Sequence, residues 1–130
     1  ELLAECRTLH GCETGKAKIT KGYRLPARYV IHTPGPVWHG GGNGEEEKLA
    51  SCYRSCLELA SANGCKTVDF PSISTGVYRF PKDKAAQIAV DTILEYLRAH
   101  SEIERVRMVC FDSRTQQYYQ DALDAAGEQV

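Results

Sequence analysis

The sequence predicts an α/β fold in which helices cover a mostly parallel sheet. Runs rich in β-formers alternate with long amphipathic helical patterns, in the order strand, strand, helix, strand, helix, strand, helix. Short segments that contain glycine or proline separate these runs. The chain has 130 residues, of which 42% are hydrophobic and 25% charged, as in an ordinary single globular domain.

The first third of the chain holds a helical pattern and two strand patterns. Residues 2–9 carry apolar side chains at helical spacing and end before Gly11, which predicts a short helix. Residues 14–20 alternate in character and predict a strand. Residues 27–33 are richer in β-formers and stop at Pro34, which predicts a second strand.

A glycine-rich segment, residues 37–44, comes next. Its glycines do not lie between a strand and a helix at dinucleotide-binding spacing, so we interpret the segment as a flexible connection. The helix after it begins with three glutamates from Glu45, which favour the positive end of the helix dipole. Apolar residues follow at helical spacing until Asn63 and Gly64 end the helix.

Two strand–helix units complete the chain. The first pairs a strand over residues 66–70 with a helix over about residues 81–100. The second pairs a strand over residues 105–111 with a helix over about residues 114–126, which Gly127 is expected to end. Right-handed crossovers would join these parallel strands.

The connection after the third strand, residues 71–81, is the main candidate for a site. Small polar residues and a glycine lie there between a strand and a helix start, where unpaired backbone N–H groups and the helix dipole attract phosphate. Phe111 and Asp112 follow the next strand, and sites in α/β folds lie beyond the carboxyl ends of strands. From these residues alone, a phosphate loop and a plain turn are about equally good interpretations.

The charge balance limits the possible partners. With 16 basic and 17 acidic residues, the net charge is −1, which argues against broad binding to nucleic acid or to an anionic membrane. No run reaches the length of a spanning helix, and the first residues lack the layout of a secretory signal. We expect an intracellular monomer that is cytoplasmic, or nuclear or mitochondrial in a eukaryote.

We expect the six cysteines to be reduced thiols rather than a disulfide framework, because a domain of this size can build a hydrophobic core without disulfide bonds. Cys52 and Cys56 lie four residues apart on an apolar helix face, where free cysteine acts as a small hydrophobe. Cys6, His10 and Cys12 lack the second ligand pair of a tetrahedral zinc site. Neither a metal nor a cofactor is expected.

Three separated runs resemble the macrodomain family, in particular its subgroup that hydrolyses ADP-ribose esters. They are residues 14–27 (TGKAKITKGYRLPA), residues 30–33 with 35–38 (VIHT and GPVW), and above all residues 70–78 (FPSISTGVY). The runs come in the family's order, and the likeness extends over nearly the whole chain. Residues 1–130 are therefore expected to form one domain.

The resemblance implies a three-layer α/β/α sandwich with a mixed, mostly parallel central sheet. It also implies a loop that wraps the pyrophosphate of ADP-ribose through backbone N–H groups. In this family the aromatic at Tyr78 lies by the distal ribose, a positioning role in catalysis, and the one at Phe111 stacks near the adenosine. The implied ligand-binding residues are Ser72, Ser74, Thr75, Gly76, Val77, Tyr78, Phe111 and Asp112.

The sequence departs from the family pattern in two ways. The family opens with a segment that supplies a central strand, an acidic residue for the adenine, and the asparagine and aspartate that orient the catalytic water. That segment is not in this sequence, so we expect an N-terminally incomplete domain whose core is opened where the central strand would pair. The family also usually has glycine at the position of Arg79.

Some residues near the candidate site have other interpretations. His32 invites a general-base role, but inside a strand a hydrogen-bonded core histidine is commoner. We reject Ser72 and Ser74 as nucleophiles, because no histidine is placed to activate them. Tyr118 and Tyr119 are interpreted as packing residues. The alternative for one of them is a contact on the adenine side of the ligand site.

Asp112 has two possible roles, as the cap of the last helix or as an acceptor for a ribose hydroxyl, and capping is the default.

The expected function is hydrolysis of ADP-ribose esters, either removal of mono-ADP-ribose from acidic side chains or deacetylation of O-acetyl-ADP-ribose. ADP-ribose, its esters and ADP-ribosylated proteins are the expected partners. The first alternative is a reader module that binds ADP-ribose without turnover. The second is a fragment that is inactive without its N-terminal part.

Overall fold

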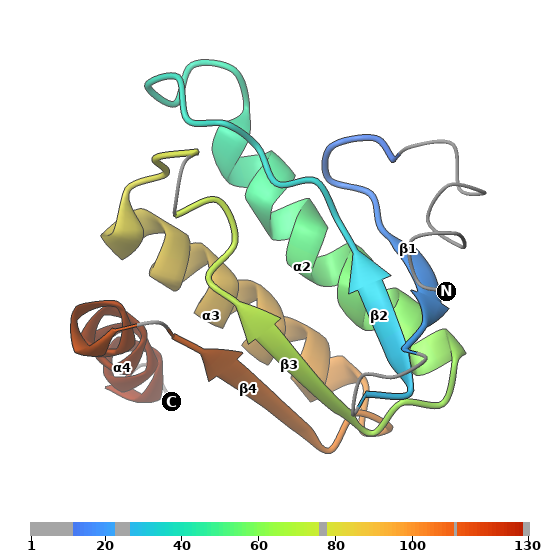
Figure 1. Cartoon of the computed structure of the whole chain (residues 1–130). Helices are drawn as coiled ribbons and strands as arrows, with labels where there is room; N and C mark the ends of the chain where they lie inside the picture. Colours follow the sequence, from blue (N-terminus) through green and yellow to red (C-terminus); the bar gives the residue numbers. More distant parts are fainter. Residues whose placement is uncertain (1–11, 23–26, 76–77, 111, 129–130) are drawn as a thin grey trace.

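The computed structural model describes residues 12–22, 27–75, 78–110 and 112–128. Its elements, shown in Figure 1, are β1 (Lys18–Lys21), β2 (Tyr29–His32), α2 (Glu45–Ala62), β3 (Thr67–Pro71), α3 (Lys82–Ala99), β4 (Arg105–Val109) and α4 (Ser113–Glu128). The predicted α/β order of these elements is confirmed. The helix predicted over residues 2–9 lies outside the described residues.

β1 and β2 form an antiparallel pair in which Thr20 lies opposite Val30. β1 begins later than predicted, at Lys18 instead of residue 14. A turn precedes it, because Gly15 has a φ of +84° and the N–H of Lys16 donates to the carbonyl of Glu13. The strand therefore starts where the chain leaves this turn.

β3 and β4 form a parallel pair, and α3 is the crossover between them. Their side chains alternate between a buried and an exposed face, as Phe70 and Asp69 illustrate. Arg107 lies opposite Asp69 and donates hydrogen bonds of 3.0 and 2.8 Å to its carboxylate. Because this ion pair is exposed, solvent screening leaves it little net effect on the free energy of unfolding.

The helices form a layer next to the strands. α2 packs against α3, α3 packs against α4, and Figure 1 shows α2 and α3 behind the strands. The buried face of α2 supports the prediction that its cysteines act as small hydrophobes. That face consists of Leu49, Cys52, Tyr53, Cys56, Leu57 and Ala60. No helix in the described part of the chain combines the length and the hydropathy needed to cross a membrane.

The predicted end of the last helix is wrong. α4 continues through Gly127 to Glu128. The backbone of Gly127 is not among those with a positive φ, so this glycine stays in the right-handed helical region. Glycine permits the left-handed C-terminal cap but does not require it.

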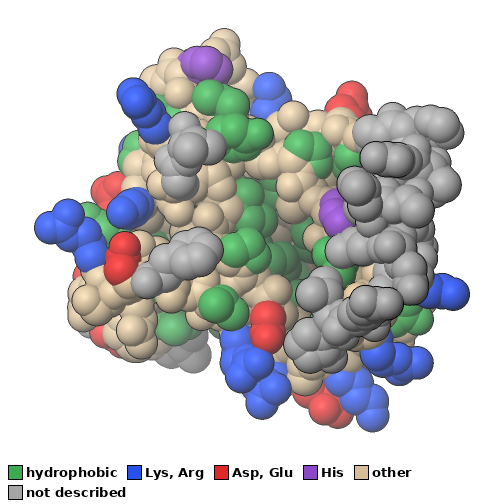
Figure 2. All heavy atoms as spheres, viewed as in Figure 1, with side chains coloured by type: hydrophobic (Ala, Val, Ile, Leu, Met, Phe, Trp, Pro, Cys, Tyr) green, Lys and Arg blue, Asp and Glu red, His purple; other side chains and the backbone are tan. Residues whose placement is uncertain are grey.

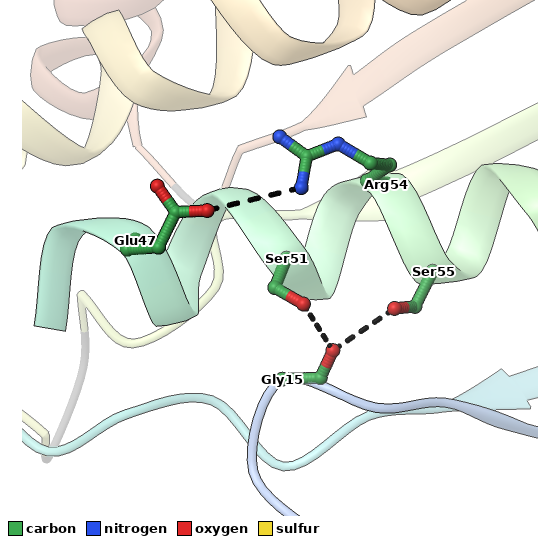
Figure 3. Close-up of polar contacts among 5 residues, drawn as sticks. All are labelled: Gly15, Glu47, Ser51, Arg54 and Ser55. Carbon is green, nitrogen blue, oxygen red and sulfur yellow. Dashed lines mark hydrogen bonds and ion pairs between the residues drawn. The ribbon is translucent and has the colours of Figure 1, made fainter. Parts of the chain in front are cut away.

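Hydroxyl groups on α2 fix the turn before β1 (Figure 3). The carbonyl of Gly15 accepts hydrogen bonds from Ser51 at 2.7 Å and from Ser55 at 2.9 Å. The N–H of Gly15 in turn donates to the carbonyl of Pro34 at 3.4 Å, which ties the turn to the segment after β2. The antiparallel pair is thereby attached to α2 at the end that faces the candidate site.

A cavity of about 1540 Å³ lies between the two pairs of strands. Residues of β2 and β3 line its opposite walls, and Figure 2 shows a hollow with hydrophobic side chains on its floor at this place. Within the described residues the strands therefore form two pairs, one antiparallel and one parallel, where the sequence predicted one sheet. The cavity separates β2 from β3 beyond hydrogen-bond reach.

Candidate functional site

The Ser72–Phe80 loop joins β3 to α3 and has a strained backbone. Ser74 and Arg79 have φ values of +65° and +59°, in the left-handed region that side chains other than glycine rarely adopt. Each such residue costs about 1–3 kcal/mol and persists only where its surroundings hold it, which occurs often at functional sites. The N–H of Phe80 donates to the carbonyl of Ser74 at 2.9 Å and closes the loop. In the macrodomain family, which the sequence resembles, glycine is usual at the position of Arg79. Glycine adopts this left-handed φ without strain, which agrees with the φ observed for Arg79.

Hydroxyl groups hold the first part of this loop. The hydroxyls of Ser72 and Tyr119 lie 2.7 Å apart, and Thr75 Oγ1 donates to Ser72 Oγ at 2.9 Å. The N–H of Ile73 donates to the hydroxyl of Tyr53 at 3.3 Å. Tyr53 belongs to α2 and Tyr119 to α4, so two helices anchor the start of the loop.

The two anchoring tyrosines are parts of the site that the sequence does not reveal. Tyr53 occupies one apolar position of a helical pattern, and the sequence predicts Tyr119 as a packing residue. Both rings are indeed buried. A buried tyrosine hydroxyl requires a hydrogen-bond partner, and this was the available signal, but the sequence could not identify that partner.

Ser74 carries the one polar side-chain atom of the described residues that is buried without a hydrogen-bond partner, its Oγ. A buried hydroxyl left in this state costs about 1–3 kcal/mol. The side chain lies against Gly35, the residue after Pro34 on the β2 side of the cavity. Within the described residues, the N–H groups of Ser74 and Thr75 have no acceptor either. These donors at the end of β3 can bind an anionic ligand without a basic side chain.

The segment after β2 forms the second wall of the site. The N–H of Trp38 donates to the carbonyl of Tyr78 at 2.9 Å, and the Trp38 ring packs on Phe80 with centroids 4.8 Å apart. The backbone of Tyr78 is thereby fixed, while its side chain is 40% exposed and lines the cavity. An aromatic ring in this position can contact a ligand without disturbing the core.

Glu45 fixes the glycine-rich segment that follows Trp38. This carboxylate is only 2% exposed and accepts backbone hydrogen bonds from His39 at 2.9 Å, Gly41 at 2.8 Å and Asn43 at 2.6 Å. The bond from His39 lowers the pKa of Glu45 most, burial opposes it, and the net pKa is about 2. The prediction of a flexible connection is wrong, because a buried charge holds three amides of the segment.

The structure brings only some of the predicted ligand-binding residues together. Ser72, Ser74 and Tyr78 line the same cavity, and Thr75 is hydrogen-bonded to Ser72. The predicted positions Gly76, Val77 and Phe111 lie outside the described residues.

Asp112 begins α4. Its Oδ1 accepts the N–H of Thr115 at 2.7 Å, which confirms the capping interpretation, and this bond lowers the pKa of Asp112. A contact between Asp112 and ribose stays a prediction.

His32 and Cys56 are engaged in structural contacts. The Nε2 atom of His32 lies 2.9 Å from the hydroxyl of Thr20 on the neighbouring strand, which confirms that this histidine is hydrogen-bonded, but the side chain is half-buried on the cavity wall and not in the core. Burial raises the pKa of the Cys56 thiol to about 12, so this thiol stays protonated and unreactive. The described residues contain no cluster of three or more histidines, cysteines or acidic residues that could hold a metal ion.

The Macro domain family model matches residues 1–89. The chain belongs to the macro domain family. This macro domain is 60% identical to the macro domain-containing protein mll7730 of Mesorhizobium japonicum over 125 residues, which are 96% of this chain and 71% of that protein. It is 54% identical to the human ADP-ribose glycohydrolase MACROD2 over 112 residues, which are 85% of this chain but 26% of MACROD2.

The fold is similar to that of the Oceanobacillus iheyensis macrodomain solved with ADP. The TM-score is 0.94 with 38% sequence identity, over 99% of this chain and 71% of that chain. This likeness confirms the predicted fold class.

Proposed function

We propose that this macro domain binds ADP-ribose at the carboxyl end of β3, where Ser74 faces Gly35 of the segment after β2, with the pyrophosphate on the N–H groups of Ser74 and Thr75. The observation that carries the proposal is Ser74, which combines a left-handed backbone with a buried hydroxyl that lacks a partner within the described residues. A phosphate oxygen would satisfy this hydroxyl and the neighbouring N–H groups. The ADP-bound structural relative and the glycohydrolase name of MACROD2 support the choice of ligand.

We further propose that the domain hydrolyses ADP-ribose esters, either mono-ADP-ribose on acidic side chains or O-acetyl-ADP-ribose. A water molecule, activated by the substrate's own phosphate, attacks beside the distal ribose and cleaves the ester bond. The products are ADP-ribose, which regains its hydroxyl, and the free carboxylic acid, which is the protein side chain for a mono-ADP-ribosylated protein and acetic acid for O-acetyl-ADP-ribose. The exposed ring of Tyr78 positions that ribose. The protein contributes orientation and preorganised donors rather than a covalent intermediate.

Ser72 does not have the surroundings of a nucleophile. Its hydroxyl lies within hydrogen-bond distance of Thr75 and Tyr119, and neither group is a base at neutral pH. The one histidine on the cavity wall among the described residues, His32, contacts Thr20 instead. A water nucleophile is therefore the better choice.

A reader module that binds ADP-ribose without turnover is the second candidate. The observation in its favour is that the hydrogen-bond partners of Ser72, Ile73 and Thr75 within the described residues are hydroxyl and carbonyl groups, none of which acts as a general base at neutral pH.

One pair of measurements separates the two candidates. Calorimetry of the 130-residue chain with ADP-ribose measures binding, and release of ADP-ribose from a protein mono-ADP-ribosylated on glutamate measures turnover. The hydrolase proposal expects both binding and release. Binding without release contradicts hydrolysis by these 130 residues and selects either the reader module or the fragment that is inactive without its N-terminal part. Absence of binding contradicts both candidates.

A further inference from the structure

Two buried tyrosines converge beneath the Ser72–Phe80 loop. Tyr53 comes from α2 with a fully buried side chain, and Tyr119 comes from α4 with 4% of its surface exposed. Tyr53 Oη accepts the N–H of Ile73, and Tyr119 Oη lies 2.7 Å from Ser72 Oγ. The two hydroxyls therefore fix the two residues directly before Ser74.

These hydroxyls remain protonated at neutral pH. Burial raises the pKa of Tyr53 well above its ordinary value, and the neighbouring Tyr119 adds to the effect. Burial also raises the pKa of Tyr119. Each hydroxyl can therefore both donate and accept a hydrogen bond across the physiological pH range.

The position of these bonds matters because Ser74 is strained. Its φ of +65° costs about 1–3 kcal/mol, and the loop keeps this conformation only if contacts on either side hold it. On one side Phe80 donates to the Ser74 carbonyl, and on the other the tyrosines hold Ser72 and Ile73. Without the tyrosine bonds, Ser74 can relax to a negative φ, and its hydroxyl and N–H then point elsewhere.

Tyr53 also decides which N–H groups are available to a ligand. It accepts the Ile73 N–H, so this donor is already used. The donors left for an anion begin at Ser74, whose N–H has no acceptor among the described residues. The tyrosine thus sets the edge of the anion-binding surface.

We propose that Tyr53 and Tyr119 are positioning residues, whose hydroxyls hold Ser72 and Ile73 and thereby keep Ser74 in the conformation that binds the pyrophosphate of ADP-ribose. The effect on affinity rests on the proposed function. The effect on loop order does not, because the hydrogen bonds exist without a ligand.

The chain contains a matched control for these tyrosines. Tyr96 is also buried, with 9% of its surface exposed, and its hydroxyl lies 2.9 Å from Ser61 Oγ. This bond joins α3 to α2 rather than to the loop. Tyr96→Phe therefore removes a buried tyrosine hydroxyl bond of the same kind and leaves the loop bonds intact.

The experiment compares Tyr53→Phe, Tyr119→Phe and Tyr96→Phe in the 130-residue chain. Hydrogen exchange of the Ile73 and Phe80 amides, which donate to Tyr53 Oη and to the Ser74 carbonyl, reports loop order. Calorimetry with ADP-ribose reports affinity, and thermal melting reports stability. We expect faster exchange at these amides and about three- to tenfold weaker binding in the first two variants only, the effect of losing one hydrogen bond. All three variants are expected to lose similar stability.

A double variant tests the coupling between Tyr119 and Ser72. If the two hydroxyls act through their mutual bond, Tyr119→Phe has little further effect on loop exchange once Ser72 is alanine. Additive effects would overturn that part of the proposal. Equal exchange and equal affinity in all three single variants would mean that Tyr53 and Tyr119 are packing residues only.

The outcomes also distinguish this inference from the proposed function. If the unmodified chain does not bind ADP-ribose but loop exchange still rises in the two variants, the proposed function is wrong and the tyrosines still hold the loop. If the chain binds ADP-ribose and the variants bind equally well with unchanged exchange, the positioning role is wrong and the function stands.

Discussion

Gly35 lies directly against Ser74, across the cavity wall, with no room between them for a side chain. A Cβ atom on Gly35 would overlap Ser74 Oγ and lie 2.7 Å from Cγ2 of Ile73. These neighbours are side-chain atoms of Ser74 and Ile73, so a side chain at position 35 would have to displace the buried Ser74 hydroxyl. The wall after β2 and the wall after β3 are therefore in direct contact at Gly35, and this contact requires a residue without a side chain.

Gly35→Ala is expected to distort the loop and weaken ADP-ribose binding. Overpacking of this kind typically costs about 1–3 kcal/mol, and here the strain falls on the ligand-binding residues. Calorimetry measures the affinity and thermal melting the stability. Gly127→Ala is the control, because Gly127 lies in α4 and a Cβ atom at this position meets no atom within 4 Å. Unchanged affinity in Gly35→Ala would contradict the proposed place of the ligand.

Tyr78→Ala is expected to lower ADP-ribose affinity without lowering stability. The ring is 40% exposed, and substitutions of exposed side chains usually change the free energy of unfolding by less than about 0.5 kcal/mol. Loss of a ribose contact worth about 1.4 kcal/mol weakens binding roughly tenfold. Parallel calorimetry and melting check both parts. A drop in melting temperature with intact affinity would show that the ring serves the fold instead.

Glu45→Gln is expected to remove a pH-dependent part of the stability. The pKa of Glu45 is lowered from 4.5 to about 2 in the folded chain, mainly by the N–H of His39. Its stabilising effect is therefore complete above pH 4.5 and is lost as the pH falls toward 2. Melting temperatures measured from above pH 4.5 down to about pH 2 should show the two proteins converging at low pH. A constant difference would mean that the charge plays no part.

Asp112→Ala is expected to destabilise α4 by about 0.5–2 kcal/mol, because the cap on the Thr115 N–H is lost. Asp112→Asn is the control, since asparagine caps helices about as well as aspartate. Chemical denaturation of the three proteins measures the difference. Equal loss of stability in both variants would point to the charge rather than the cap.

Much of the fold could be predicted from the sequence, because the signals are local. Apolar spacing gave the two long helices that begin at Glu45 and near Pro81, and β-former runs gave the strands. Errors arose where a residue permits more than one conformation. Gly127 continues a helix that it was expected to end, and Gly15 forms a turn inside a predicted strand.

The site could be predicted only in part. The position of Ser72, Ser74 and Tyr78 at the end of a strand follows from topology, and all three line the cavity. Contacts between distant segments could not be predicted, because a single sequence carries no pairing information. The Tyr119–Ser72 bond spans 47 residues.

The hydrogen bonds between the Glu45 carboxylate and the backbone of the glycine-rich segment were not predicted either, although the two are adjacent in sequence. A glutamate at a helix start is usually solvated, and here its burial decides its role.

The most direct test of the proposed site is to follow the backbone amides of the 130-residue chain by NMR during titration with ADP-ribose. The largest chemical-shift changes are predicted at Ser74, Thr75 and Tyr78 and at Gly35 on the facing wall. Small shifts at these amides together with large shifts elsewhere would contradict the placement of the pyrophosphate on the Ser72–Phe80 loop.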